Sequence, residues 1–163
     1  MGRKKVLAVA LATGCRGATG GAAVNVAGGA VAQCCKDGPL YGVLNGKNEV
    51  SPTGKRRAGD PDGKGSASAI YDEGKLCFGL TVKNIGTPTG AHIHRGTRGK
   101  NGPIVVHLSP PSAGDPGASS GCVNVQESLA RSILRRPHRF YWNVHTSEYP
   151  AGAIRGQVFE KRR

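Results

Sequence analysis

Residues 89 to 108 read TGAHIHRGTRGKNGPIVVHL and carry three of the five histidines of the chain. His92 and His94 are separated by one residue in a segment typical of a β-strand. Side chains two residues apart on a strand point to the same face, so we expect the Cα atoms of this pair about 6.5–7 Å apart and their rings adjacent. Both imidazoles could therefore bind one metal ion.

A third histidine, His145, ends the alternating run 140–145 and points to the face opposite its apolar residues. If this strand lies beside the first, three imidazoles converge and leave an open coordination position, which suits copper or zinc. The alternative is a polar patch without an ion, because neutral histidine both donates and accepts hydrogen bonds. We interpret His107 as a structural residue of an apolar run, and His138 as a solvated or turn residue.

A basic, glycine-rich loop follows the first histidine pair. Arg95, Arg98 and Lys100 form either a solvated rim or a contact surface for an anionic partner. A phosphate-binding loop would need a helix N-terminus after its glycines, whereas the strand-like PIVVHL follows here.

Short apolar–polar alternations between turn residues predict the elements that position these side chains. We expect strands at residues 40–44, 67–71, 76–82, 91–94, 103–108, 122–125, 140–145 and 153–159. Asp72-Glu73-Gly74 predicts a hairpin turn, and residues 51–65 and 109–121 predict exposed loops. Residues 126–136 change to a helical period, with Asn124 and Glu127 resembling a capping box and Pro137 ending the helix.

The chain starts with MGRKK followed by VLAVALA, an apolar run too short to cross a bilayer as a stable helix. We interpret it as an export signal cut after Ala32, with a lipoprotein-type cut before Cys15 and an uncleaved or differently targeted tail as alternatives. No transmembrane span is expected after its removal, and the product is secreted or held in the cell envelope. The expected order is a signal and Gly/Ala-rich leader at 1–32, a short segment at 33–39, one domain at 40–160 and a basic tail at 161–163.

Loss of the leader would leave four of the five cysteines, an even number that suits an oxidising compartment. The chain has no Cys-x-x-Cys pair, so neither a zinc ribbon nor a thioredoxin-type motif is indicated. Cys77 and Cys122 lie in expected strands and are the candidate disulfide. Cys34 and Cys35 are adjacent and pair with each other, with another chain, or not at all.

The net charge is +13, and loss of the leader would remove four cations, Arg3, Lys4, Lys5 and Arg16, to leave +9. Such a charge attracts acidic proteins, anionic glycans, envelope polymers or nucleic acid. Export and the absence of aromatic residues interleaved with basic ones make nucleic acid the weakest of these candidates.

Known catalytic motifs are poorly matched, since the chain has no Gly-x-Ser-x-Gly, His-Glu-x-x-His or Gly-x-x-x-x-Gly-Lys sequence. Its acids cluster in turns such as 60–62, where we expect solvated carboxylates without the perturbed pKa that acid–base catalysis needs. We expect Arg155, within GAIRGQV, in a strand near the sheet surface, paired with Glu49 or Glu148.

Several phrases together resemble one family, the CHRD (chordin-type) domain. They are GVLNGKNEVSP at 42–52, LCFGLTV at 76–82, GAHIHRGTRGKNGPIVVHL at 90–108, Gly-Cys at 121–122 and YWNVHTSEYPAGAIRGQV at 141–158. The resemblance covers residues 40–160 and implies an extracellular β-sandwich module. Such domains recur in chordin, which binds a secreted growth factor, and occur singly in exported bacterial proteins. No established catalytic residue is carried over.

A more distant likeness is to the copper/zinc superoxide dismutases, whose ligands include a His-x-His pair and a late-strand histidine. The match is partial, because the segment 95–103 contains neither histidine nor aspartate. Turn-rich strands and a single helix predict an all-β, antiparallel Greek-key sandwich, immunoglobulin-like or dismutase-like.

Two functional hypotheses follow. The favoured one is an exported, non-enzymatic binding or structural domain that recognises an extracellular protein or an anionic glycan or envelope polymer. The alternative is a copper- or zinc-binding protein, either a carrier or a weak redox protein, that uses His92, His94 and His145.

Overall fold

An antiparallel β-sheet makes up most of the computed structural model, which describes residues 38–113 and 117–160. All of these belong to one compact unit, Cys34–Arg163. The strands are β1 (Leu40–Asn45), β2 (Lys64–Asp72), β3 (Lys75–Lys83), β4 (Pro88–Arg95), β5 (Ile104–Leu108), β6 (Gly117–Asn124), β7 (Phe140–Thr146), β8 (Ile154–Gln157) and β9 (Phe159–Glu160). The helices are α1 (Glu127–Arg135) and the 3-10 turns η1 (Gly46–Asn48) and η2 (Pro137–Arg139).

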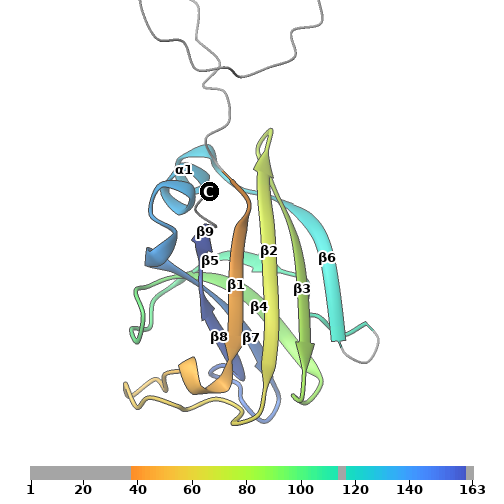
Figure 1. Ribbon diagram of the computed structural model, residues 1–163, viewed down its shortest axis with the longest axis vertical. Helices are drawn as coiled ribbons and strands as arrows, with labels where there is room; N and C mark the ends of the chain where they lie inside the picture. Colours follow the sequence, from red (N-terminus) through yellow and green to blue (C-terminus); the bar gives the residue numbers. More distant parts are fainter. Residues whose placement is uncertain (1–37, 114–116, 161–163) are drawn as a thin grey trace, which may run out of the picture. The chain divides into compact units, whose positions relative to one another are not determined.

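The strands follow one continuous hydrogen-bonded order, β5-β4-β7-β8-β1-β2-β3-β6, with β9 paired to β1. In Figure 1, β1, β2, β3 and β6 form the near half of the sheet, and β4, β5 and β7 lie behind them. The chain crosses between the two halves after β3 and after β5, as in a Greek key. The prediction of an all-β, antiparallel fold with one short helix is confirmed.

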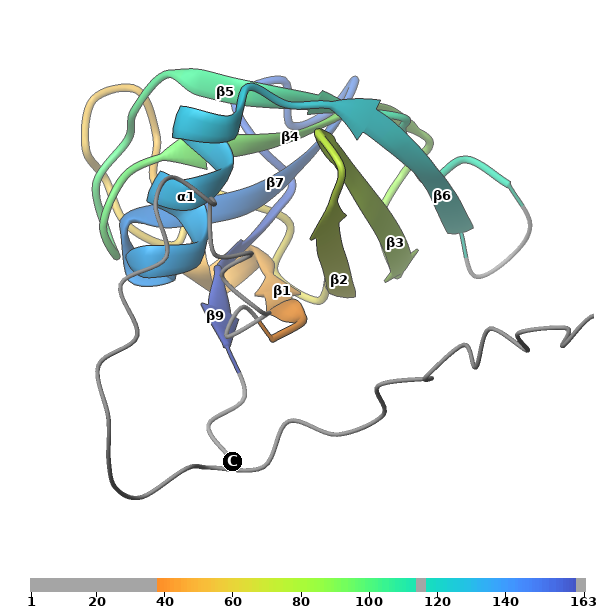
Figure 2. The same ribbon diagram turned by 90° about the horizontal axis from the view of Figure 1, so that it is seen from above.

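The two halves enclose a single hydrophobic core, which α1 covers at one end (Figure 2). Strand alternation explains its composition: Ala91 and Ile93 of β4, and Trp142 of β7, are fully buried, while their polar neighbours face outward. Ile133 of α1 is also fully buried. Each such large apolar side chain stabilises the fold by about 1.5–3 kcal/mol relative to its exposed state.

The first and last strands of this order, β5 and β6, approach each other. The Ser119 hydroxyl of β6 donates a hydrogen bond of 2.8 Å to the carbonyl of Ser109, which follows β5. Ala113, in the connection between these strands, pairs with Ala118 of β6. The sheet therefore nearly closes on itself.

Several strand ends differ from the sequence prediction by one to three residues, and three larger differences concern β6, the last strand and the start of α1. β6 begins at Gly117, inside the expected loop 109–121, because small residues without alternation pair with β3 along their whole length. The expected strand 153–159 is two short strands, separated where the Val158 amide donates to the carbonyl of Phe140. The capping box is wrong: Asn124 belongs to β6, and the N-cap of α1 is Gln126, which makes no side-chain capping bond.

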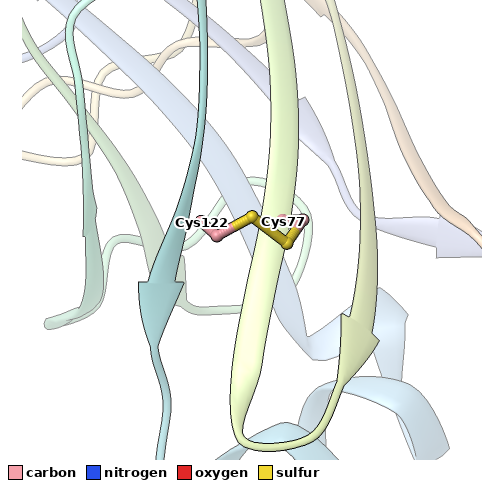
Figure 3. The surroundings of a disulfide bond; sticks show 2 residues. All are labelled: Cys77 and Cys122. Atoms are coloured by element: carbon pink, nitrogen blue, oxygen red, sulfur yellow. A yellow bond between two sulfur atoms is a disulfide. The ribbon is translucent and has the colours of Figure 1, made fainter.

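Cys77 of β3 and Cys122 of β6 lie directly opposite each other and form a disulfide, as predicted (Figure 3). The proposed signal at 1–32, residues Cys15, Cys34 and Cys35, and the tail at 161–163 lie outside the described residues. Within the described part of the chain, no helix combines the length and apolar character needed to span a membrane.

Candidate metal centre

β4 and β7 are neighbours in the sheet, and this pairing brings the three histidines together. Gly90 lies opposite His145, and His92 lies opposite Asn143. Because His92 and His94 alternate with the buried Ala91 and Ile93, their rings emerge on the outer face of β4. The His145 ring emerges on the same outer face of β7.

One potential ligand nitrogen from each of His92, His94 and His145 lies within 4.8 Å of the other two. The shortest separation is 3.1 Å, between His92 Nδ1 and His145 Nε2. The centroid of the His92 ring lies 5.6 Å from that of the His94 ring and 5.0 Å from that of the His145 ring. Side chains this close can share one ion with small rotations of their rings.

Backbone carbonyls orient two of the three rings. His94 Nδ1 lies 3.0 Å from the carbonyl oxygen of Gly102, and His145 Nδ1 lies 3.0 Å from that of Pro150. A carbonyl oxygen only accepts, so each Nδ1 carries the proton and each Nε2 keeps a free electron pair. His94 Nε2 is buried and has no hydrogen-bond partner among the described residues. Metal-bound histidines are commonly fixed in this way, through the nitrogen that does not bind the metal.

The same surroundings keep the rings neutral. Burial, followed by the neighbouring imidazoles, lowers the pKa of His92 from 6.5 to about 4. Burial also lowers the pKa of His94 and of His145, against the opposing effect of their carbonyl hydrogen bonds. Neutral imidazole is the form that binds a metal, so at neutral pH these rings do not have to release the extra proton of an imidazolium before they bind one.

The side chains of Tyr141 and Arg155 form a stack against the ring of His94. The ring of Tyr141 lies parallel to that of His94, at 4.8 Å between centroids and 11° between planes. The guanidinium carbon of Arg155 lies 3.3 Å from the centroid of Tyr141. The stack therefore connects β8, β7 and β4 and restricts the orientation of His94.

Arg155 is paired with Glu49, one of its two predicted partners, at 3.7 Å between Nη1 and Oε1. The prediction that Arg155 lies near the surface is wrong, because only 2% of its area is exposed. The loop between β4 and β5 covers it: Nη1 donates to Asn101 Oδ1 at 2.9 Å, and Nη2 donates to the carbonyl of Lys100. Burial raises the pKa of Glu49, while the neighbouring Arg155 acts against this shift.

The three predicted anion-binding residues lie beside this network, on the surface. Arg95, Arg98 and Lys100 are all exposed, and Arg95 lies over the ring of Phe140 at 5.1 Å. Their loop is held firmly, because Asn101 Nδ2 donates to the carbonyls of Val50 and Ser51.

His107, interpreted from sequence as a structural residue, lies in β5 directly opposite His92. Its ring is 4.9 Å from that of His92, and the residue is exposed. His138 lies in η2 and is not part of the group. The strands β4 and β5, which carry these two histidines, form a hairpin, and neither this pairing nor its register was predicted.

The family model of the CHRD domain matches residues 40–158 of the chain. The chain belongs to the CHRD domain family. Searches of curated proteins and of solved structures found no significant match. Membership of the CHRD family agrees with the predicted resemblance and supports a non-enzymatic domain. The disulfide of this CHRD domain is compatible with an extracellular location.

Proposed function

We propose that this CHRD domain binds one copper or zinc ion through His92, His94 and His145. The observation that carries the proposal is the convergence of three imidazoles whose ligand atoms lie within 4.8 Å of one another. The carbonyl contacts of His94 and His145 add support, because they direct an unprotonated Nε2 away from the backbone.

The ligand set bears on the identity of the ion. Imidazole suits both copper and zinc, and a divalent copper ion generally binds nitrogen ligands more tightly than zinc does. Three protein ligands leave a position for water or an exchanging ligand. These properties suit a carrier that releases its ion. The disulfide and the basic, apolar start of the chain support the further proposal that it acts after export.

The test is the metal content of the full chain, purified without a histidine tag, loaded with copper or zinc and then dialysed. We expect one equivalent in the wild type and loss of that equivalent in His92→Ala. The loss in affinity should exceed the roughly 10–100-fold cost of removing an outer partner of a metal ligand. His138→Ala is the matched control, because this exposed histidine lies outside the group. Absence of bound metal in the loaded wild type, or full retention in His92→Ala, would contradict the proposal.

A second candidate function is recognition of an anionic extracellular protein, glycan or envelope polymer. The specific observation in its favour is that exposed Arg98 and Lys100 project from a loop held by Asn101 and Arg155. A rigid loop loses less conformational entropy when it binds than a flexible one does. The two functions involve neighbouring but different side chains.

A further inference from the structure

A fourth histidine adjoins the proposed metal site but does not belong to it. His107 is exposed on β5, and its cross-strand partner His92 is half-buried on β4. We propose that His92 and His107 form a second, outer metal position, which takes a copper ion from solvent and passes it to the three-histidine site. This inference rests on the proposed function.

The geometry of the pair suits an ion. Residues directly opposite in an antiparallel ladder have Cβ atoms about 4.5–5.5 Å apart, so two imidazoles there can approach one ion from two sides. The rings of His92 and His107 are 4.9 Å apart between centroids and perpendicular to each other. Because both residues belong to paired strands, the sheet itself, and not a loop, fixes this separation.

His92 is the member common to both positions. Its ring centroid is 4.9 Å from that of His107 on one side and 5.0 Å from that of His145 on the other. His107 is absent from the set of histidines whose ligand atoms all lie within 4.8 Å of one another, so it is not counted among the ligands of the three-histidine site.

Transfer between the positions is a ligand exchange. The bond from copper to His107 breaks, the bonds to His94 and His145 form, and His92 remains bound to the ion. The copper keeps its oxidation state throughout. When copper binds His92 through Nδ1, the proton that this nitrogen donates to His145 Nε2 in the metal-free protein moves to Nε2 of His92, so the ring stays neutral.

At Gly90, on the same strand as His92, there is no side chain to cover the His92 ring. A Cβ atom at Gly90 would lie 3.3 Å from His92 Cε1 and 3.8 Å from His145 Cδ2, against the edges of both rings. Glycine therefore leaves this side of the His92 and His145 rings free of a side chain.

The rate of copper loading tests the inference. Full-length, untagged chain is mixed with aqueous copper(II), and quenching of Trp142, the single tryptophan, is followed with time. We expect His107→Ala to load about tenfold more slowly than the wild type, within the range over which mutants of one binding site change their association rates. The final stoichiometry should remain one equivalent. His138→Ala, which removes a different exposed histidine, should load at the wild-type rate.

A second arm detects the outer position alone. In His145→Ala the three-histidine site is incomplete, and we expect weak copper binding that disappears when His107→Ala is added. Wild-type loading rates in His107→Ala would overturn the outer position and leave the proposed function intact. Loss of the tight equivalent in His107→Ala would also overturn it, because His107 would then be a ligand of the final site. A wild type that binds no copper would overturn both proposals.

Discussion

The outer face of β4, β7 and β8 carries histidine, tyrosine and arginine side chains under a cover of loops, whereas the groove on the outer face of β1, β2, β3 and β6 is lined by uncharged and mostly small residues. No charged residue lines the groove of about 880 Å³ on the second face, which includes Ser66, Ser68 and Thr81. On the first face, Arg155 and Glu49 are almost fully buried. Burying polar and charged groups costs free energy unless they are paired. A stable sheet does not need such groups, so their burial on the first face supports the site proposed there.

Among the changes that test this comparison, we expect Arg155→Ala to have the largest effect on the free energy of unfolding. The substitution leaves the Glu49 carboxyl buried without its partner and should lower the free energy of unfolding by about 3–5 kcal/mol. Urea unfolding followed by the fluorescence of Trp142 measures the change. Arg131→Ala is the matched control, because the ion pair of Arg131 with Glu127 on α1 is exposed, and we expect no measurable change there. An unchanged unfolding midpoint in Arg155→Ala would show that the buried pair does not hold the site together.

Removal of the disulfide, by Cys77→Ser together with Cys122→Ser, tests the opposite face. The bond closes a sequence separation of 45 residues. We expect its loss to lower the free energy of unfolding by about 2–4 kcal/mol, because the unfolded chain regains conformational entropy.

Copper binding by this double variant should match that of the wild type, since β3 and β6 contribute none of the three ligands. Loss of the bound equivalent would show that the two faces are coupled, and it would remove the contrast drawn between them. Unfolding of the double variant with and without a reductant provides the internal control.

The smallest effect on stability is expected from neutralising Arg95, Arg98 and Lys100 together as glutamine. All three are exposed, so unfolding should not change, but retention on an anionic matrix should fall and depend less steeply on salt. The matched control neutralises Lys64, Lys75 and Lys83, exposed residues of β2 and β3, and removes the same charge. An equal fall in both variants would assign retention to net charge and not to the basic loop.

Alternation in the sequence predicted the strands and the common face of the histidines. His92 and His94 flank the buried Ile93, and this local period depends only on the geometry of an extended chain. The turn after β2 was also a local prediction: Glu73 and Gly74 have φ angles of 44° and 83°, the left-handed conformation that a two-residue hairpin requires.

The parts of the site that were not predicted depend on contacts between distant residues. The position of His107 opposite His92 comes from the register between β4 and β5, which includes an irregularity between Ile93 and His94. Arg155 is buried because loops more than fifty residues away fold over it, as its bond to Asn101, at a sequence separation of 54, illustrates. The alternation of apolar and polar residues within a strand does not encode these contacts between distant residues.

The contact between Ser119 and Ser109 at the ends of the sheet has a consequence for self-association. Unpaired strand borders invite other chains to extend a sheet, and proteins avoid aggregation by covering them. Here the pairing of Ala113 with Ala118 occupies part of the border of β6. This pairing leaves less of the border of β6 open to a strand from a second copy of the chain.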